Sequence, residues 1–145
     1  MLKKYSTNRL DIKNKGTITS KRVIHIAEDL SYNYGEDVVV YDVKNKSPFV
    51  SYYIVCSVSN ETKMRKVVQV AEDSLYDNYK TLDYKEGKNN SKWILLDARD
   101  VVIQLFLRDE RERVNFDSLY NDCPHKVVIC EKEPVYRKRK KINEK

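Results

Sequence analysis

The chain contains few of the residues from which compact catalytic and metal sites are usually built. Its 145 residues include three glycines, three cysteines and two histidines. Gly16, Gly35 and Gly87 stand far apart, so no glycine-rich loop that cradles phosphate groups is present. An odd number of cysteines in a reducing compartment predicts free thiols without a disulfide framework. These scarcities disfavour an enzyme.

Long hydrophobic runs are also missing. No apolar stretch approaches the length of a membrane span, and the N-terminus has no apolar segment typical of a secretion signal. We therefore expect a cytoplasmic protein that does not interact with a membrane. The hydrophobic fraction of 41% suffices for one domain with a modest core, but not for two such cores.

Positive charge is concentrated at the two ends of the chain. Residues 1–22 contain seven Lys/Arg and one acidic residue, and residues 132–145 contain seven Lys/Arg and two acidic residues. Because the whole chain carries +6, the segment between them is acidic. We interpret residues 1–18 as a flexible basic arm, 19–122 as the folded domain and 123–145 as a basic tail. The basic ends either bind RNA phosphates or only increase solubility.

The pattern of apolar residues predicts an α/β domain. Apolar residues recur at helical spacing over 23–30 and again over 64–75, each time after a capping residue. A charged helix over 108–114 and a short closing helix are expected near the end. The expected strands are 38–43, 52–58, 81–84, 93–96 and 101–106, with 126–129 as an extra candidate. Because a helix between two strands permits a parallel pair, we expect a mixed sheet of about five strands with helices packed on it.

The segment Glu86–Phe106 is the most informative part of the sequence. It holds the only Trp, and its two apolar runs flank Ala98–Asp100, which predicts a β-hairpin. The turn is unusual because it contains no glycine, although a tight hairpin usually requires a positive φ.

Trp93 and the acidic residues of this hairpin are our candidates for binding a partner. An aromatic side chain after a polar loop can anchor an interface, and Asp97 and Asp100 would surround it with negative charge. That combination suits a basic protein surface. Two alternatives remain open. Trp93 can be a core residue at the end of its strand, and the two aspartates can form an exposed acidic corner or a Mg²⁺ site.

One cluster of potential metal ligands lies near the C-terminus. Cys123, His125 and Cys130 are close enough in sequence to suggest zinc, but no fourth ligand has a standard spacing. We therefore expect neither a metal nor another cofactor.

Three motifs resemble those of the ribosomal silencing factor family, also called Iojap-like proteins, over residues 27–120. The first motif comprises Asp42, Val43 and Ser47, before the strand that begins at Tyr52. The second comprises Glu86, Gly87, Trp93–Asp97 and Asp100–Val102. The third comprises Arg111, Phe116, Asp117, Leu119 and Tyr120. The chain departs from the family pattern at Arg99, where the family has Gly, and at Gln104, where it has His.

The resemblance implies a fold, a partner and a mechanism. Family members have a mixed-sheet α/β fold similar to nucleotidyltransferases, without their catalytic carboxylates, and they often form homodimers. They bind the large ribosomal subunit through its protein fourteen, block joining of the small subunit and so repress translation. Here Trp93, Asp97 and Asp100 would make the contact, with Tyr52 and Arg111 beside them unless Arg111 holds the last helix by an ion pair. The alternative function is a nucleotidyltransferase-like enzyme or a nucleotide-binding protein.

Overall fold

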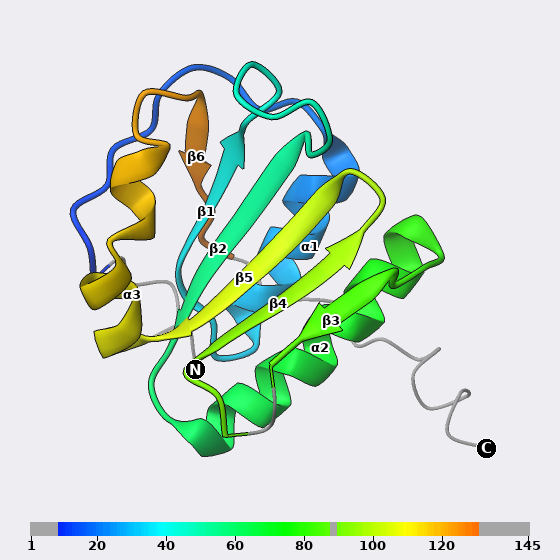
Figure 1. Cartoon of the computed structure of the whole chain (residues 1–145), viewed down its shortest axis with the longest axis vertical. Coiled ribbons are helices and arrows are strands. Elements are labelled where there is room, and N and C mark those ends of the chain that lie inside the picture. The colour runs from blue at the N-terminus through cyan, green and yellow to red at the C-terminus, as the bar shows by residue number, and fades with distance from the viewer. Residues whose placement is uncertain (1–8, 88–89, 131–145) are drawn as a thin grey trace.

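A six-stranded mixed sheet organises the fold (Figure 1). The structure, a computed structural model, describes residues 9–87 and 90–130. The strand order is β3-β4-β5-β2-β1-β6, in which β2 and β5 pair in parallel and the other described neighbours are antiparallel. The strands are β1 (Glu36–Asp42), β2 (Tyr52–Val58), β3 (Tyr84–Glu86), β4 (Trp93–Ala98), β5 (Val101–Leu107) and β6 (His125–Val127).

The expected mixed α/β architecture is confirmed, with six strands in the sheet where about five were expected. The additional strand is β6, which overlaps the extra candidate at 126–129 and pairs with β1 through Tyr41–His125 and Val39–Val127. Three residues are too few to show a periodic pattern, so the pairing with β1 is what identifies β6 as a strand.

Two helices cover one face of the sheet. α1 (Lys21–Tyr32) and α2 (Glu61–Tyr79) begin after Ser20 and Asn60, whose side chains accept hydrogen bonds from backbone N–H groups of the first turn. Apolar side chains of both helices pack against alternate residues of the strands and form the main core. Its buried members include Val23, Ile26, Leu30, Met64, Val67, Leu75, Val40, Ile54, Leu96 and Ile103. None of the helices in the described part is long and apolar enough to span a membrane.

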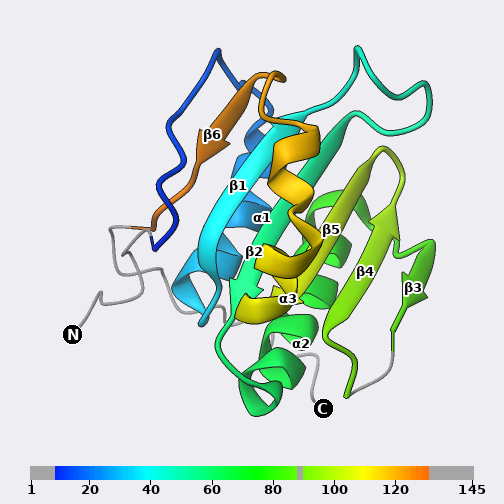
Figure 2. The same cartoon turned by 60° about the vertical axis from the view of Figure 1, so that its left-hand side comes forward.

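The opposite face of the sheet is covered over only part of its width. α3 (Arg108–Val114) and the 3-10 helix η2 (Phe116–Leu119) lie on this side, as Figure 2 shows, and leave β3 and β4 without a helix there. A second, smaller core lies beneath them. Its buried residues are Val39, Tyr41, Val43, Val55, Phe106, Phe116 and Cys123.

The β4–β5 turn reverses the chain without a glycine. Ala98 pairs with Val101, and Arg99 between them adopts a positive φ of 58°. Asp83 stabilises this geometry because its carboxylate accepts the backbone N–H of Arg99 at 2.8 Å. The hairpin is confirmed, and an arginine takes the conformation that glycine adopts at least cost.

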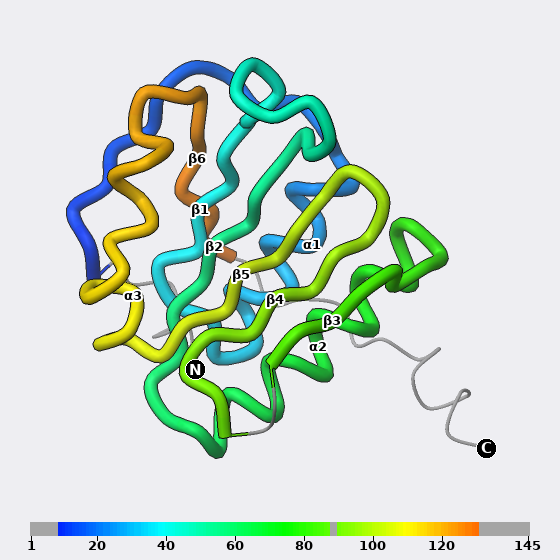
Figure 3. The backbone as a smooth tube through the Cα atoms, in the orientation of Figure 1, coloured from blue at the N-terminus to red at the C-terminus, as the bar shows by residue number. Residues whose placement is uncertain are grey.

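Both ends of the described chain are part of the fold, beyond the expected domain limits of 19 and 122. Lys15 and His125 exchange backbone hydrogen bonds with N···O distances of 2.9 and 2.6 Å. The N-terminal segment therefore runs beside β6, as the tube in Figure 3 shows. At the other end, the N–H of Cys130 donates to the Ser31 hydroxyl at 3.1 Å. The rest of the expected basic arm and basic tail lies outside the described residues.

Candidate partner-binding face

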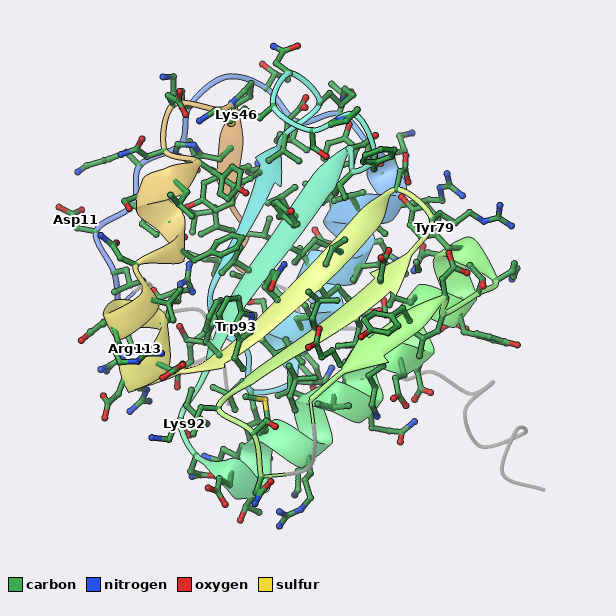
Figure 4. The ribbon with its side chains drawn as sticks, in the orientation of Figure 1. Asp11, Lys46, Tyr79, Lys92, Trp93 and Arg113 are labelled. Carbon is green, nitrogen blue, oxygen red and sulfur yellow. The ribbon has the colours of Figure 1, made fainter. Side chains whose placement is uncertain are left out.

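β4 presents half of its side chains on the face that α3 and η2 leave uncovered. Trp93, Leu95 and Asp97 alternate along the strand with buried residues of the main core. On β3, Tyr84 lies opposite Asp97 and Glu86 lies opposite Leu95, and paired residues project to the same side of a sheet. We call these five residues the open face. Figure 4 shows Trp93 on the side of the sheet toward the viewer, beside α3.

Trp93 is both packed and exposed. Its ring stacks on Phe106 of β5 with 4.8 Å between the ring centroids, and its indole N–H donates to Gln104 Oε1 at 2.8 Å. Gln104 is only 3% exposed, so its side chain is held in place and keeps the acceptor oxygen beside the indole N–H. By contrast, 39% of the Trp93 surface remains exposed. The structure therefore combines the two interpretations of the sequence. Part of the indole belongs to the fold, and the rest is accessible to a partner.

Asp97 lies on the same face as Trp93, four residues along the strand and so about 13 Å away. Partial burial raises the pKa of Asp97, and the nearby Asp83 carboxylate raises it further. Within the described residues, Asp97 forms no ion pair with a Lys or Arg side chain. A partly desolvated carboxylate without a cation is unfavourable, so a cationic group supplied by a partner would stabilise it.

Asp100 and Tyr52, also expected at the contact, lie elsewhere. Asp100 occupies the turn at the far end of β4 from Trp93, on the side of α2. Burial raises the pKa of Tyr79 on α2, and the charge of Asp100 adds to that effect. Tyr52 packs against the main core beneath the helices. The structure thus brings Trp93 and Asp97 onto one surface but leaves the other two away from it.

Arg111 stabilises the fold and is not offered to a partner, because it is 1% exposed. Its Nε and Nη2 donate to the Asp117 carboxylate at 2.8 and 2.9 Å, and its Nη1 donates to Asp37 O at 2.7 Å and Ser57 Oγ at 3.0 Å. Burial would raise the pKa of Asp117, but the hydrogen bonds and charge of Arg111 outweigh it and lower the pKa. The same carboxylate accepts the Tyr41 hydroxyl. Of the two roles expected for Arg111, the structure shows the ion pair.

Of the potential zinc ligands near the C-terminus, His125 uses both of its ring nitrogens in other contacts. The Nδ1 atom of His125 lies 2.8 Å from Cys123 O, and its Nε2 atom lies 2.7 Å from Lys13 O. The ring therefore ties the N-terminal segment to β6. Among residues 9–87 and 90–130, no three His, Cys, Asp or Glu side chains are grouped as a metal site would require.

Sequence analysis did not identify the residues that support Trp93. Gln104 and Phe106 pair with Leu95 and Trp93 across the hairpin, and this register places them on the same side of the sheet. The run Val101–Leu107 is apolar except for Gln104. Polar and apolar residues therefore do not alternate in it, and the sequence did not show which of its side chains lie on each face of the sheet. A single buried amide in such a run was the available sign that a polar partner lies beside it.

Comparisons with known proteins point to one family. The model of a family described as ribosomal silencing factor during starvation matches residues 17–145. The ribosomal silencing factor of Haemophilus influenzae is 30% identical over 99 residues, which cover 66% of this chain and 93% of that protein. Its counterpart in Bacillus subtilis is 27% identical over 89 residues, or 61% of this chain and 75% of that protein. A solved structure from Bacillus halodurans has a similar fold, with a TM-score of 0.63 at 21% identity, and covers 75% of this chain and 100% of that one.

Proposed function

Because the chain belongs to the ribosomal silencing factor family, we propose that it binds the large ribosomal subunit through that subunit's protein fourteen and blocks joining of the small subunit. Translation then falls because fewer complete ribosomes assemble. The observation that carries the proposal is the open face. There an ordered, partly exposed Trp93 projects from the same strand as Asp97, which has no ion pair among the described residues.

The open face has the chemistry of a protein-binding surface. Binding free energy concentrates in a few aromatic anchors, and anchors that are already ordered lose little conformational entropy on binding. Trp93 is ordered by its ring contact with Phe106 and its hydrogen bond to Gln104. Asp97 and Glu86 add negative charge to the same surface, which complements a basic ribosomal protein.

Occlusion requires a surface and not a catalytic cleft. A domain that sits on the subunit interface prevents the small subunit from approaching for as long as it remains bound. The inhibition of subunit joining therefore depends on slow dissociation. Well-packed anchor residues change the dissociation rate more than the association rate. Trp93 is the residue of the open face best suited to this role.

The test compares two variants that each lose an exposed aromatic side chain. Trp93→Ala removes the proposed anchor, and Tyr76→Ala removes a side chain that is 62% exposed on α2, on the other side of the sheet. Each purified protein is mixed with large subunits and separated on a sucrose gradient, and small subunits are then added to measure joining. We expect Trp93→Ala to weaken binding by about 10- to 100-fold, as for a central anchor, and Tyr76→Ala to have no effect.

Equal binding by the wild type and Trp93→Ala would exclude the open face as the docking surface. Because Trp93 also packs on Phe106, a second variant separates binding from folding. Asp97→Lys reverses a charge on the open face without removing the ring contact. Its thermal midpoint is expected to stay within a few degrees of the wild type, while its binding to the basic partner decreases.

The basic tail is proposed to add contacts to ribosomal RNA. Residues 132–145 contain seven Lys/Arg and two acidic residues. Each phosphate neutralised makes binding more dependent on salt. Deleting this segment is expected to flatten the plot of log affinity for the large subunit against log salt concentration, and an unchanged slope would remove the tail from the interface.

A further inference from the structure

A polar groove lies along α1 and is also lined by residues of α2 and β6. α1 and α2 cover the face of the sheet opposite the open face, and Figure 1 shows both helices behind the sheet. The groove has a volume of about 670 Å³, and its polar lining consists of Lys21, Arg22, His25, Glu28, Asn78 and Lys126. Lys126 pairs with Val40, whose side chain belongs to the core beneath α1 and α2. Because paired residues project to the same side, Lys126 faces α1 and not the open face.

Positive charge exceeds negative charge among the residues that line this groove. Three of its side chains are cationic, and Glu28 is the one carboxylate among them. Within the described residues, neither Lys21 nor Lys126 forms an ion pair. By contrast, the arginines elsewhere in the fold include three with a carboxylate oxygen within 3 Å, namely Arg108 at 2.6 Å, Arg111 at 2.8 Å and Arg113 at 2.7 Å.

Arg22 is held in place by two contacts, neither of which is with a carboxylate, and it forms no ion pair within the part of the chain that the structure describes. Its guanidinium lies over the Tyr79 ring, 4.1 Å from the centroid, and one Nη donates to the Asn78 carbonyl at 3.3 Å. An arginine stacked on an aromatic ring keeps its remaining N–H groups in a fixed plane, the geometry that suits phosphate oxygens. The flanking Lys21 and Lys126 ammonium groups are exposed and add point charges.

We propose that this groove binds phosphate groups of an RNA backbone. This inference rests on the proposed function in one respect, because ribosome binding would bring the groove close to RNA. The groove is lined by exposed cations, which suits a polymer passing over it better than a small molecule enclosed by it. Because Trp93 lies on the other side of the sheet, a protein on the open face and an RNA in the groove can be bound at the same time.

The test uses two double variants of the full chain that remove the same charge from different places. Lys21→Gln with Lys126→Gln removes the two unpaired ammonium groups of the groove, and Arg65→Gln with Lys66→Gln removes two exposed cations of α2. Binding of a short, fluorescently labelled RNA duplex is measured by anisotropy over a series of salt concentrations. We expect the groove variant to lose about tenfold in affinity and its salt slope to decrease by about two, whereas the α2 variant matches the wild type.

Equal losses of RNA affinity in the two double variants would overturn the proposal, because the affinity would then depend only on the net charge of the protein. Inorganic phosphate at constant ionic strength provides a second measurement. If it raises the thermal midpoint of the wild type but not of the groove variant, while both bind RNA equally, the groove binds a free phosphate and the RNA assignment is wrong. The co-sedimentation of Trp93→Ala is a separate readout, so failure of the groove leaves the open-face proposal to be judged on its own result.

Discussion

Replacing Arg111 with methionine tests the buried ion pair that holds α3 and η2 on the sheet. Methionine approximately fills the space of the aliphatic stem but donates no hydrogen bond. The substitution leaves the Asp117 carboxylate without its cation and the Asp37 carbonyl without the donor at 2.7 Å. Removing one partner of a buried pair costs about 3–5 kcal/mol of unfolding free energy. For a chain of this size the thermal midpoint should fall by about 10–15 °C.

The pH dependence of this loss gives a sharper test. Burial raises the pKa of Asp117, and the hydrogen bonds and charge of Arg111 lower it more, so its net pKa in the folded protein is below the ordinary value. A depressed carboxyl pKa contributes stability above the unfolded pKa of about 3.9, and that contribution is lost as the pH falls through the folded pKa. In Arg111→Met, burial remains without the cation, so the Asp117 pKa should be raised. The variant should then recover stability relative to the wild type as the pH falls from 7 toward 3.

Urea denaturation followed by circular dichroism at several pH values measures both effects. A matched control replaces both partners, Arg111→Met with Asp117→Leu, and should be more stable than the single variant because no unpaired carboxylate remains. A loss below about 1 kcal/mol at neutral pH would refute the reasoning, as would a difference between wild type and Arg111→Met that does not change with pH.

Two further substitutions test the hairpin. Arg99→Gly should raise the unfolding free energy by about 0.5–1 kcal/mol, because glycine adopts the φ of 58° without the clash of a Cβ atom. A lower thermal midpoint would show that the Arg99 side chain makes a stabilising contact. Gln104→Leu removes the acceptor of the Trp93 indole N–H, so the emission of this single Trp should shift and binding to the large subunit should weaken about 2- to 10-fold. Unchanged emission and binding would show that Gln104 does not position Trp93.

The strands of the sheet were largely predictable because their own residues specify them. Tyr52–Val58 was expected as a strand from its β-branched and aromatic run and has those bounds in the structure. The two strands of the hairpin were also expected, and each extends one or two residues further. Local propensity and burial act in the same direction in these segments, so the residues alone were sufficient.

The assignment of faces required the tertiary structure. Asp97 and Asp100 are three residues apart in one hairpin, yet one projects from the open face and the other lies in the turn on the side of α2. For Arg111 the sequence left open a partner contact or an ion pair that holds the last helix. It could not decide between them because Asp37 and Ser57, which accept its hydrogen bonds, come from distant segments. The bridge between Lys15 and His125 joins residues more than a hundred positions apart, which no local pattern can indicate.

Trp93 shows why a core position and a binding position need not be alternatives. An exposed aromatic ring on a mobile side chain would lose conformational entropy when a partner immobilised it. In this fold the indole packs on Phe106 and its N–H donates to Gln104. The side chain is therefore already ordered in the folded protein, and this conformational entropy is lost on folding and not on binding. In the proposed complex, the remaining 39% of its surface would then meet the partner in a preset orientation. If the chain acts by occupying the surface of the large subunit, as we propose, an anchor ordered in advance prolongs the bound state, and a longer bound state gives stronger inhibition.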